Sequence, residues 1–364
     1  MKRSVAGHPN PIIADDVSRI VSAIPDWRSL ARRTVLVTGA NGFLPAYIVE
    51  VLLSLAELGV LNEAEVPRVI ALTRNERHAR LRFAHRIGSP GLEILVQDVC
   101  DPLPPHVRPD YIIHAASPAS PKFYRDDPVG TINPNTLGTA QLLERAAETE
   151  AEGFLFFSTS EIYGMLPDGA IPMPGDAVGV LDPIDPRSCY AEAKRLGEAL
   201  CVAWQRQFGV PSRIVRPFHV YGPGMRLDDG RVFADFVADV LAGRDIKLMS
   251  AGTATRSFCY LSDATEGLFR IILLGADAVA YNLGHPEGET SISDLANIIA
   301  GLYPEKGLSV SRAVREAGSS YLPSPIERSC PDISRLQAIG WTPTTGVAEG
   351  FRRTIDSFAF GGAA

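Results

Sequence analysis

The sequence predicts an α/β fold, a doubly wound parallel sheet with a smaller C-terminal α/β domain. Short runs of β-branched residues alternate with helical patterns from residue 34 to about 216, and such alternation builds a parallel sheet with helices on both faces. Beyond residue 217 the pattern becomes irregular, with Pro- and Gly-rich stretches at 217–230 and 318–332. The length of 364 residues also favours about two domains.

The strands of the main sheet follow from apolar, β-branched runs in chain order. They are expected at 34–38, 68–73, 92–97, 110–114, 153–159 and 212–217. Helical periodicity is clear between them, around 51–55, 139–147 and 187–208.

Residues 1–33 precede the first strand and form an N-terminal extension with one expected helix. Its stretch 15–24 carries an apolar face, and Asp15 or Asp16 is the expected N-cap. The apolar positions are Val17, Ile20, Val21 and Ile24. We expect this helix to pack on the body of the protein or on a partner.

Composition excludes several classes of function. With a net charge of −7 and no basic run interleaved with aromatic residues, no nucleic-acid partner is expected. No apolar run reaches the roughly 18 to 20 residues of a membrane span, and acidic residues stand where a signal peptide needs an apolar core. We therefore expect a cytoplasmic protein without a membrane partner. The five cysteines are scattered without CxxC spacing, so neither disulfides nor a metal site is expected.

The first strand is followed by a glycine turn and a helix start, the order that a dinucleotide-binding fold needs. Gly39 and Gly42 let the backbone approach a pyrophosphate, whose charge then sits on the helix N-terminus. The third small position of the usual pattern is occupied by Pro45, which a first helical turn tolerates. The sequence thus predicts a Rossmann-type cofactor domain over 34–216. Residues 217–364 are expected to form mainly the substrate domain, with some segments returning to the Rossmann sheet.

The residues after the second and third strands bear on the choice of cofactor. An acid that would bind the ribose hydroxyls of NAD is missing from 71–75, and Arg74 favours a 2′-phosphate and hence NADP. The alternative is that Arg74 is simply solvated. Asp98, or the backbone beside it at Val99, can read the adenine.

A tyrosine and a lysine four residues apart form the expected catalytic pair. Tyr190 and Lys194 lie on one helix face. A nearby ammonium lowers the pKa of the phenol, which would let Tyr190 exchange a proton with a substrate hydroxyl while hydride moves to a nicotinamide. The preceding strand ends in Ser158, Thr159, Ser160 and Glu161.

Taken together, these motifs resemble the extended short-chain dehydrogenase/reductase family of sugar-nucleotide epimerases, dehydratases and decarboxylases. The resemblance covers about residues 34–358 and is carried by TGANGF (38–43), HAAS (114–117), NPNTLGT (133–139), STSEIYG (158–164), YAEAK (190–194) and VYGP (220–223). Within the family the sequence is most similar to the UDP-glucuronate decarboxylase group, through SPASP (117–121), PRSCYAEAKR (186–195), DDGRV (228–232), TATRSFCYLSD (253–263), YNLGHPE (281–287) and PDI (331–333).

The resemblance implies a nicotinamide cofactor, and it favours NAD where Arg74 favours NADP. We therefore expect NAD, with NADP as the alternative. The implied cofactor-binding residues are Gly39, Asn41, Gly42, Phe43, Leu44, Arg74, Asp98, Val99, Ala115, Ala116, Ser117, Asn135, Ser158, Tyr190, Lys194 and Pro217.

The resemblance implies a nucleotide-sugar substrate that is UDP-linked. Ser160 stands where a 4,6-dehydratase carries the acid for water loss, whereas Glu161 matches the glutamate that handles protons near C4 and C5 in the decarboxylase group. Arg256 is expected to bind the sugar carboxylate or the diphosphate, or else to form a structural ion pair. The implied substrate-binding residues are Ser120, Glu161, His219, Arg231, Arg256 and Arg328, and for Arg231 and Arg328 an ordinary surface role is the alternative.

Two positions depart from the family pattern. His219 replaces an asparagine that touches the substrate, and it is either a satisfied polar neighbour or a catalyst. Gly224 replaces the arginine of YGPR, although Arg226 could reach the same area.

The expected catalytic set is Thr159, Glu161, Tyr190, Lys194 and Arg256. The expected reaction oxidises the sugar at C4, releases CO₂ and reduces the 4-keto sugar again; a 4-epimerase, a 4,6-dehydratase and a non-catalytic NAD(P) sensor are the alternatives. The family likeness also implies a homodimer. Its contact helix would present Leu196, Leu200 and Val202, a stripe that could equally pack within one subunit.

Overall fold

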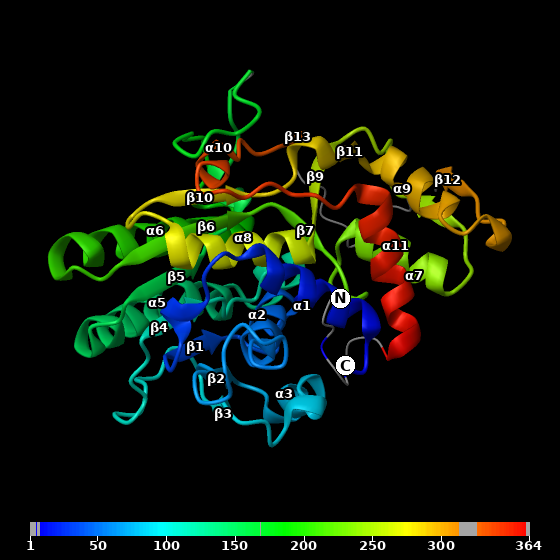
Figure 1. The fold of residues 1–364 in the computed structure, drawn as a ribbon. Coiled ribbons are helices and arrows are strands. Elements are labelled where there is room, and N and C mark those ends of the chain that lie inside the picture. The colour runs from blue at the N-terminus through cyan, green and yellow to red at the C-terminus, as the bar shows by residue number, and fades with distance from the viewer. Residues whose placement is uncertain (1–4, 6–7, 168, 313–325, 362–364) are drawn as a thin grey trace.

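The computed structural model describes residues 5, 8–167, 169–312 and 326–361. At its centre seven strands form one parallel sheet in the order β10-β6-β5-β4-β1-β2-β3 (Figure 1). The strands are β1 (Thr34–Thr38), β2 (Arg68–Thr73), β3 (Leu92–Val96), β4 (Tyr111–His114), β5 (Gly153–Phe157), β6 (Ser212–Pro217) and β10 (Ala280–Leu283). The expected doubly wound parallel sheet is confirmed.

Alternate residues of β1 show why helices cover both faces of this sheet. Val35 and Val37 belong to the core on one side, whereas Leu36 belongs to the core on the other. Because successive side chains of a strand point to opposite faces, a continuous apolar strand must be buried twice. The first side is covered by α1 (Pro11–Ala23), α2 (Phe43–Ser54) and α8 (Leu261–Leu274), and the second by α5 (Pro128–Thr149) and α6 (Cys189–Phe208).

The strand order reverses at β1, which pairs with β2 on one side and with β4 on the other. Connections leave the sheet in opposite directions at such a switch point, so a crevice opens outside the carboxyl ends of the strands. Thr38, the last residue of β1, lies opposite His114 of β4 and Leu72 of β2. The crevice therefore begins directly after these residues.

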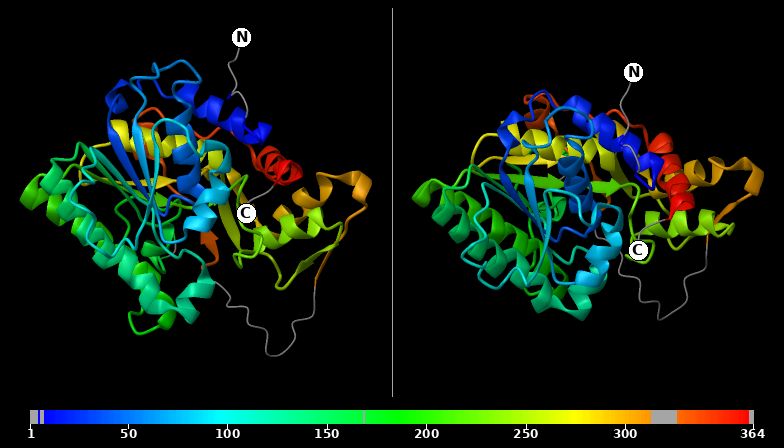
Figure 2. Two further views of the ribbon diagram at one scale, coloured as in Figure 1. Left: turned by 90° about the horizontal axis from the view of Figure 1, so that it is seen from below. Right: turned by 60° about the horizontal axis from the view of Figure 1, so that its bottom comes forward.

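A second region lies beside the main sheet (Figure 2). It contains a four-stranded sheet, in which β9 (Thr255–Tyr260) pairs with β7 (His219–Tyr221), β11 (Glu289–Ser291) and β13 (Arg328–Ser329), and the pair β8 (Ile246–Leu248) and β12 (Val310–Arg312). Its helices are α7 (Val232–Leu241), α9 (Ile292–Gly301) and α11 (Val347–Ser357), which share a separate aromatic-rich core. The remaining α-helices of the described residues are short: α3 (Glu76–Arg82), α4 (Pro121–Asp126) and α10 (Ser334–Gln337).

The N-terminal helix α1 is longer than expected and is capped elsewhere. Asn10 is the N-cap, since its side-chain oxygen accepts hydrogen bonds from the backbone amides of Ile12 and Ile13. The expectation of a cap at Asp15 or Asp16 is wrong, because both lie inside the helix. The expected apolar face is buried, and α1 packs on α2, α8 and α11 of the same chain.

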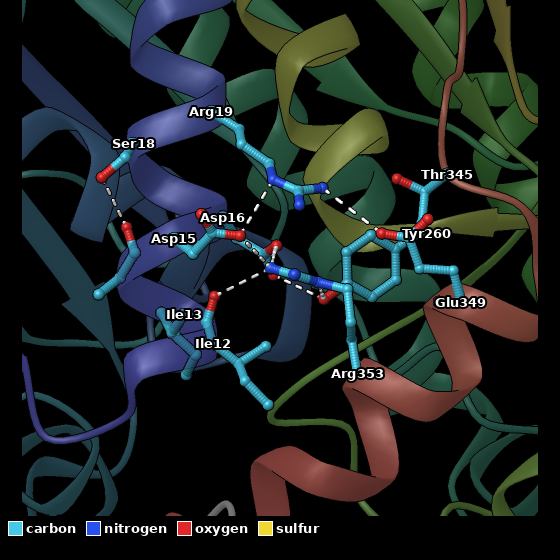
Figure 3. A network of polar contacts seen from close by, with 12 residues as sticks. Ile12, Ile13, Asp15, Asp16, Ser18, Arg19, Tyr260, Thr345, Glu349 and Arg353 are labelled. Atoms are coloured by element: carbon cyan, nitrogen blue, oxygen red, sulfur yellow. Dashed lines mark hydrogen bonds and ion pairs between the residues drawn. The ribbon is translucent and has the colours of Figure 1, made fainter. Parts of the chain in front are cut away.

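Asp16 joins α1 to three other elements through buried polar contacts (Figure 3). Its carboxylate accepts hydrogen bonds from Tyr260 of β9 at 2.7 Å, from Arg353 of α11 at 2.5 Å and from Tyr47 of α2 at 3.2 Å. Asp15 adds a second contact to Arg353 at 2.8 Å. The extension is thus part of the packed body.

No helix in the described part of the chain combines the length and apolar character needed to cross a bilayer.

The expected apolar stripe on α6 is only partly exposed. Leu196 and Val202 are exposed, whereas Leu200 packs partly buried against the core.

Candidate active site

One large cavity, of about 1230 Å³, opens at the carboxyl ends of the parallel strands and extends to the second region. All the expected site residues except Asn135 and Arg328 line it. Side chains from β5, α6, β7 and β9 therefore meet the glycine turn after β1, although they come from distant parts of the sequence. This volume is large enough for a ligand well beyond the size of a monosaccharide.

The glycine turn is shaped by backbone contact. Gly39 has φ +63°, and a Cβ atom there would lie 2.9 Å from the Cα atom of Ala116. The amide of Gly42 donates to the carbonyl of Gly39 at 2.8 Å, and α2 starts at the next residue. The turn therefore brings the N-terminus of α2 to the cavity wall without a side chain in between. This arrangement fits the phosphates of a dinucleotide.

Arg74 is held by a carboxylate. One of its guanidinium nitrogens lies 3.7 Å from Asp98, and Asp98 also accepts a hydrogen bond from the backbone amide of Cys100 at 2.9 Å. That hydrogen bond, together with the charge of Arg74, lowers the pKa of Asp98. Arg74 and Asp98 thus form a partly exposed ion pair on the cavity wall, in which 62% of the Arg74 side chain is exposed to solvent.

Asn135 lies behind the cavity wall. Its side-chain nitrogen donates to the Ser117 hydroxyl at 3.0 Å and to the Thr131 carbonyl at 2.7 Å, while its side-chain oxygen is buried without a partner among the described residues. Ser117 itself lines the cavity. Asn135 therefore orients Ser117 rather than contacting the cavity directly.

Tyr190 is almost fully buried, with 5% of its surface exposed, and stacks on Tyr124 at a centroid distance of 4.8 Å. Burial raises the pKa of Tyr190, and the charge of Glu161 raises it further, whereas a hydrogen bond with Thr159 and the charge of Arg231 lower it. A phenol in this setting is protonated at neutral pH. It can donate a hydrogen bond as long as no base or developing negative charge takes its proton.

Lys194 does not lower the pKa of Tyr190 in this structure, contrary to our expectation. Its ammonium nitrogen lies 5.7 Å from the centre of the Tyr190 ring and donates to the backbone carbonyl of Phe157. Burial lowers the pKa of Lys194 to about 7, against an opposing effect of Glu198. Glu198 in turn is bound by Arg216, at 2.6 and 2.8 Å. The Lys194 side chain is therefore positioned by its contact with Phe157 at the end of β5 as well as by its own helix, α6.

Glu161 lies in a short 3₁₀ turn, Ser160–Tyr163, that Thr159 caps by accepting a hydrogen bond from the Glu161 amide at 3.2 Å. Burial raises the pKa of Glu161, and the charges of Arg187, Arg231 and Arg256 oppose that rise. Three cations thus act on the Glu161 carboxylate inside the cavity. This local group of arginines suits an anionic ligand.

The arginines on the second region are held in place by their surroundings. Arg256 of β9 donates to the carbonyls of Thr255 at 2.7 Å and Ile326 at 2.8 Å. Arg231, the N-cap of α7, lies 3.6 Å from Asp229 and donates to the carbonyl of Ala119 at 3.3 Å. Neither guanidinium has to be ordered entirely by a ligand.

Comparison with known proteins agrees with this geometry. A model of the NAD dependent epimerase/dehydratase family matches residues 35–284. The chain belongs to this family. UDP-glucuronic acid decarboxylase 3 of Arabidopsis thaliana is 36% identical over 326 residues, covering 89% of this chain and 88% of the relative. UDP-glucuronic acid decarboxylase 1 of Danio rerio is 34% identical over 330 residues, covering 90% of this chain and 73% of the relative.

A solved family structure has the same fold. The UDP-glucuronic acid 4-epimerase from Bacillus cereus, in complex with UDP-glucuronic acid and NAD, superposes with a TM-score of 0.73 at 23% identity. The match covers 90% of this chain and 99% of the epimerase chain.

His219, which departs from the family pattern, has a buried ring nitrogen, Nδ1, without a hydrogen-bond partner among the described residues. Burial and the charges of Arg256 and Arg231 lower the pKa of His219 to about 3. The imidazole is therefore neutral at physiological pH. It can form a hydrogen bond with a ligand, but it is not a proton donor of the imidazolium type.

Arg328 is the expected substrate residue that the structure keeps away from the cavity. Its Nε and Nη2 atoms donate hydrogen bonds to the Glu289 carboxylate at 2.7 and 2.9 Å, and half of its side chain is exposed. The alternative of an ordinary surface role describes this geometry.

The cavity residues that were not expected include Arg82 on α3, Tyr124 on α4 and Arg187 in the turn before α6. Arg187 could have been found, since it stands three residues before Tyr190 within a motif that carries the family resemblance. Tyr124 carries no local signal. Its role as a stacking partner of Tyr190 depends on how α4 packs against α6.

No metal site is expected from the sequence, and the structure brings three possible metal ligands together outside the cavity. They are His8, Glu50 and His85, whose ligand atoms lie within 4.8 Å of one another. Glu50 already accepts hydrogen bonds from His85 and Arg86, each at 2.9 Å. These contacts satisfy its charge, so the cluster is accounted for as a polar contact between the N-terminal segment and α2.

Proposed function

We propose that the protein decarboxylates a UDP-glucuronate-like sugar nucleotide, oxidising the sugar at C4 and then reducing it again. The observation that carries this proposal is the position of Glu161 among Arg187, Arg231 and Arg256, in the same cavity as Tyr190. A uronate carboxylate and a diphosphate are both anions, and three cations suit them better than they would suit a neutral hexose alone. The curated relatives named above point to the same substrate class.

Tyr190 and Thr159 are the groups that would act on the 4-hydroxyl. Burial keeps Tyr190 protonated, so it first releases its own proton to solvent, a loss that the charge of Arg231 favours; the phenolate then takes the hydroxyl proton, while Thr159, which hydrogen-bonds Tyr190, orients it. The nicotinamide, when bound, supplies reversible acceptance and return of hydride at C4. Lys194, which donates to the backbone carbonyl of Phe157, would bind the cofactor beside Tyr190.

Loss of CO₂ follows from the position of the new ketone. A 4-ketone is β to the C6 carboxylate, so the electron pair of the breaking C5–C6 bond passes into the C4 oxygen as an enolate. Tyr190 and Thr159 donate hydrogen bonds toward that oxygen, where they stabilise the developing charge. C5 then needs one proton, and Glu161 is the nearby acid whose raised pKa suits its delivery. Ser160 offers no acid to expel water.

The cofactor is proposed to be NAD. Asp98 pairs with Arg74, so the pair is neutral overall and a 2′-phosphate would meet the Asp98 carboxylate. Binding measurements with NAD⁺ and NADP⁺ test this choice. Tighter binding of NADP⁺ would reverse it.

We also propose a homodimer formed through α5 and α6. Leu137 on α5 and Leu196 and Val202 on α6 are all exposed, and these two helices pack against each other. Large apolar side chains gathered on neighbouring helices favour a contact with a second copy. Light scattering on the wild type and a Leu196→Glu variant tests it. A monomeric wild type would contradict the proposal.

The deciding experiment is mass spectrometry of UDP-glucuronate and, separately, dTDP-glucose after incubation with the enzyme and NAD⁺. Loss of CO₂ from UDP-glucuronate supports the proposal. A product of unchanged mass but altered sugar would indicate a 4-epimerase, and loss of water from dTDP-glucose a 4,6-dehydratase. Tyr190→Phe is the matched variant: it should bind cofactor while turnover falls about 10²- to 10⁴-fold. A non-catalytic sensor would keep its biological effect in this variant.

A further inference from the structure

The space beside Gly224 is occupied by an arginine from the other half of the molecule. Gly224 has φ +83°, and a Cβ atom there would lie 2.4 Å from Nη2 and 2.7 Å from Nη1 of Arg82. Arg82 is the last residue of α3, which follows β2 of the main sheet, whereas Gly224 follows β7. The guanidinium therefore bridges the two halves of the cavity, and a Cβ atom at position 224 would displace it from this place.

Arg82 differs from the other cavity arginines in its partners. Arg74, Arg226 and Arg231 each lie within 4.0 Å of an aspartate. Among the described residues, Arg82 has no carboxylate within that distance and no hydrogen bond. Burial lowers the pKa of Arg82, while Tyr47 and Glu50 raise it, yet an arginine stays protonated in proteins at neutral pH.

Glu50 does not serve as the counter-ion. Its two carboxylate oxygens are already bound by His85 and Arg86 at 2.9 Å. A largely buried charge that lacks a protein partner costs folding free energy, and a ligand that brings the opposite charge removes that cost. Arg82 lines the cavity together with the turn of Gly39 and Gly42, so such a ligand has access to it.

We propose that Arg82 and the backbone at Gly224 form a phosphate subsite, which binds a diphosphate group as it enters between the two halves. A planar guanidinium matches two phosphate oxygens at once. The inference rests on the proposed function only in taking this cavity as the place where a dinucleotide and a nucleotide sugar bind. Both ligands carry a diphosphate, and the experiment separates them.

The test measures dissociation constants of NADH and of UDP by calorimetry for the wild type, Arg82→Gln and Arg80→Gln. Arg80 is the matched control, since it is on the same helix but exposed and paired with Glu76. Arg82→Gln should weaken one of the two ligands about tenfold or more, and the ligand that is weakened identifies the source of the diphosphate. Arg80→Gln should change neither. Unchanged affinities of a folded Arg82→Gln protein for both ligands would overturn the proposal.

A second pair of variants keeps the Arg82 charge and tests whether its position matters. Gly224→Ala pushes the guanidinium away, and Gly243→Ala is its control, because Gly243 has φ +66° but no atom within 4 Å of an added Cβ. We expect weaker diphosphate binding only in Gly224→Ala; equal affinities in the two variants would count against the subsite. CO₂ release by the wild type is measured separately. If the wild type releases CO₂ but Arg82→Gln binds both ligands normally, only this inference is wrong. If Arg82→Gln binds a ligand more weakly but the wild type releases no CO₂, only the proposed function is wrong.

Discussion

The carboxylate of Asp16 accepts a hydrogen bond from the hydroxyl of Tyr260 at 2.7 Å, although the two residues are 244 positions apart. Tyr260 ends β9, the strand that carries Arg256 into the cavity. Arg353 of α11 closes the contact from the other side (Figure 3). The N-terminal helix therefore buttresses the strand that presents a proposed substrate residue.

Removing the charge of Asp16 is expected to destabilise the protein by about 3 kcal/mol, because Arg353 would be left without its fully buried partner. Chemical denaturation of Asp16→Asn measures the change in free energy of unfolding. Asp15→Asn is the control: its carboxylate is 44% exposed, so we expect a loss below about 1 kcal/mol. Equal effects of the two substitutions would contradict the role of the buried carboxylate.

Gly39→Ala is expected to reduce both stability and NAD binding. The left-handed backbone conformation and the contact of the new Cβ with Ala116 together cost roughly 3 kcal/mol. Gly209→Ala separates the two causes, since Gly209 has φ +73° but nothing near an added Cβ, and it should cost about 1 kcal/mol. Thermal unfolding and NAD calorimetry on both variants check this. Normal NAD binding by Gly39→Ala would contradict the close approach.

Lys194 should make stability depend on pH in the alkaline range. Its pKa is about 7 in the folded protein and has the ordinary lysine value in the unfolded chain. Between these values the unfolded chain binds more protons, so the stability contributed by this residue rises with pH. Denaturation at several pH values should show the wild type gaining on Lys194→Met by at most about 1.4 kcal/mol per pH unit. A difference that is flat or falls with pH would refute this.

Arg187→Gln should shift the pH dependence of catalysis. Arg187 opposes the rise in the pKa of Glu161, so its removal raises that pKa further. Glu161 must be protonated to deliver the C5 proton, so its deprotonation sets the alkaline limb of the kcat/KM profile, and that limb should move to higher pH. Arg206→Gln, at an exposed position in the last turn of α6, is the control and should leave the profile unchanged. An alkaline limb that stays at the wild-type pH in Arg187→Gln would exclude the proposed coupling.

Local sequence patterns predicted most of the fold. The strands β1 to β6 and the helices α2, α5 and α6 were expected close to where they lie, because each is specified by neighbouring apolar positions. The α1 cap was misplaced since Asp16, a strong capping residue by type, is used in the interior for a long-range contact. Such a use leaves no trace in the adjacent residues.

The types of residue at the site could likewise be predicted from the sequence, but their protonation states and ion pairs could not. Glycine at 39 and the spacing of Tyr190 and Lys194 already indicated a nicotinamide enzyme. Only the tertiary structure decided that burial raises the pKa of Tyr190, that Arg328 pairs with Glu289, and that Arg82 occupies the space beside Gly224. Burial and ion pairing depend on which distant elements meet, and a sequence pattern records only the order of neighbours along the chain.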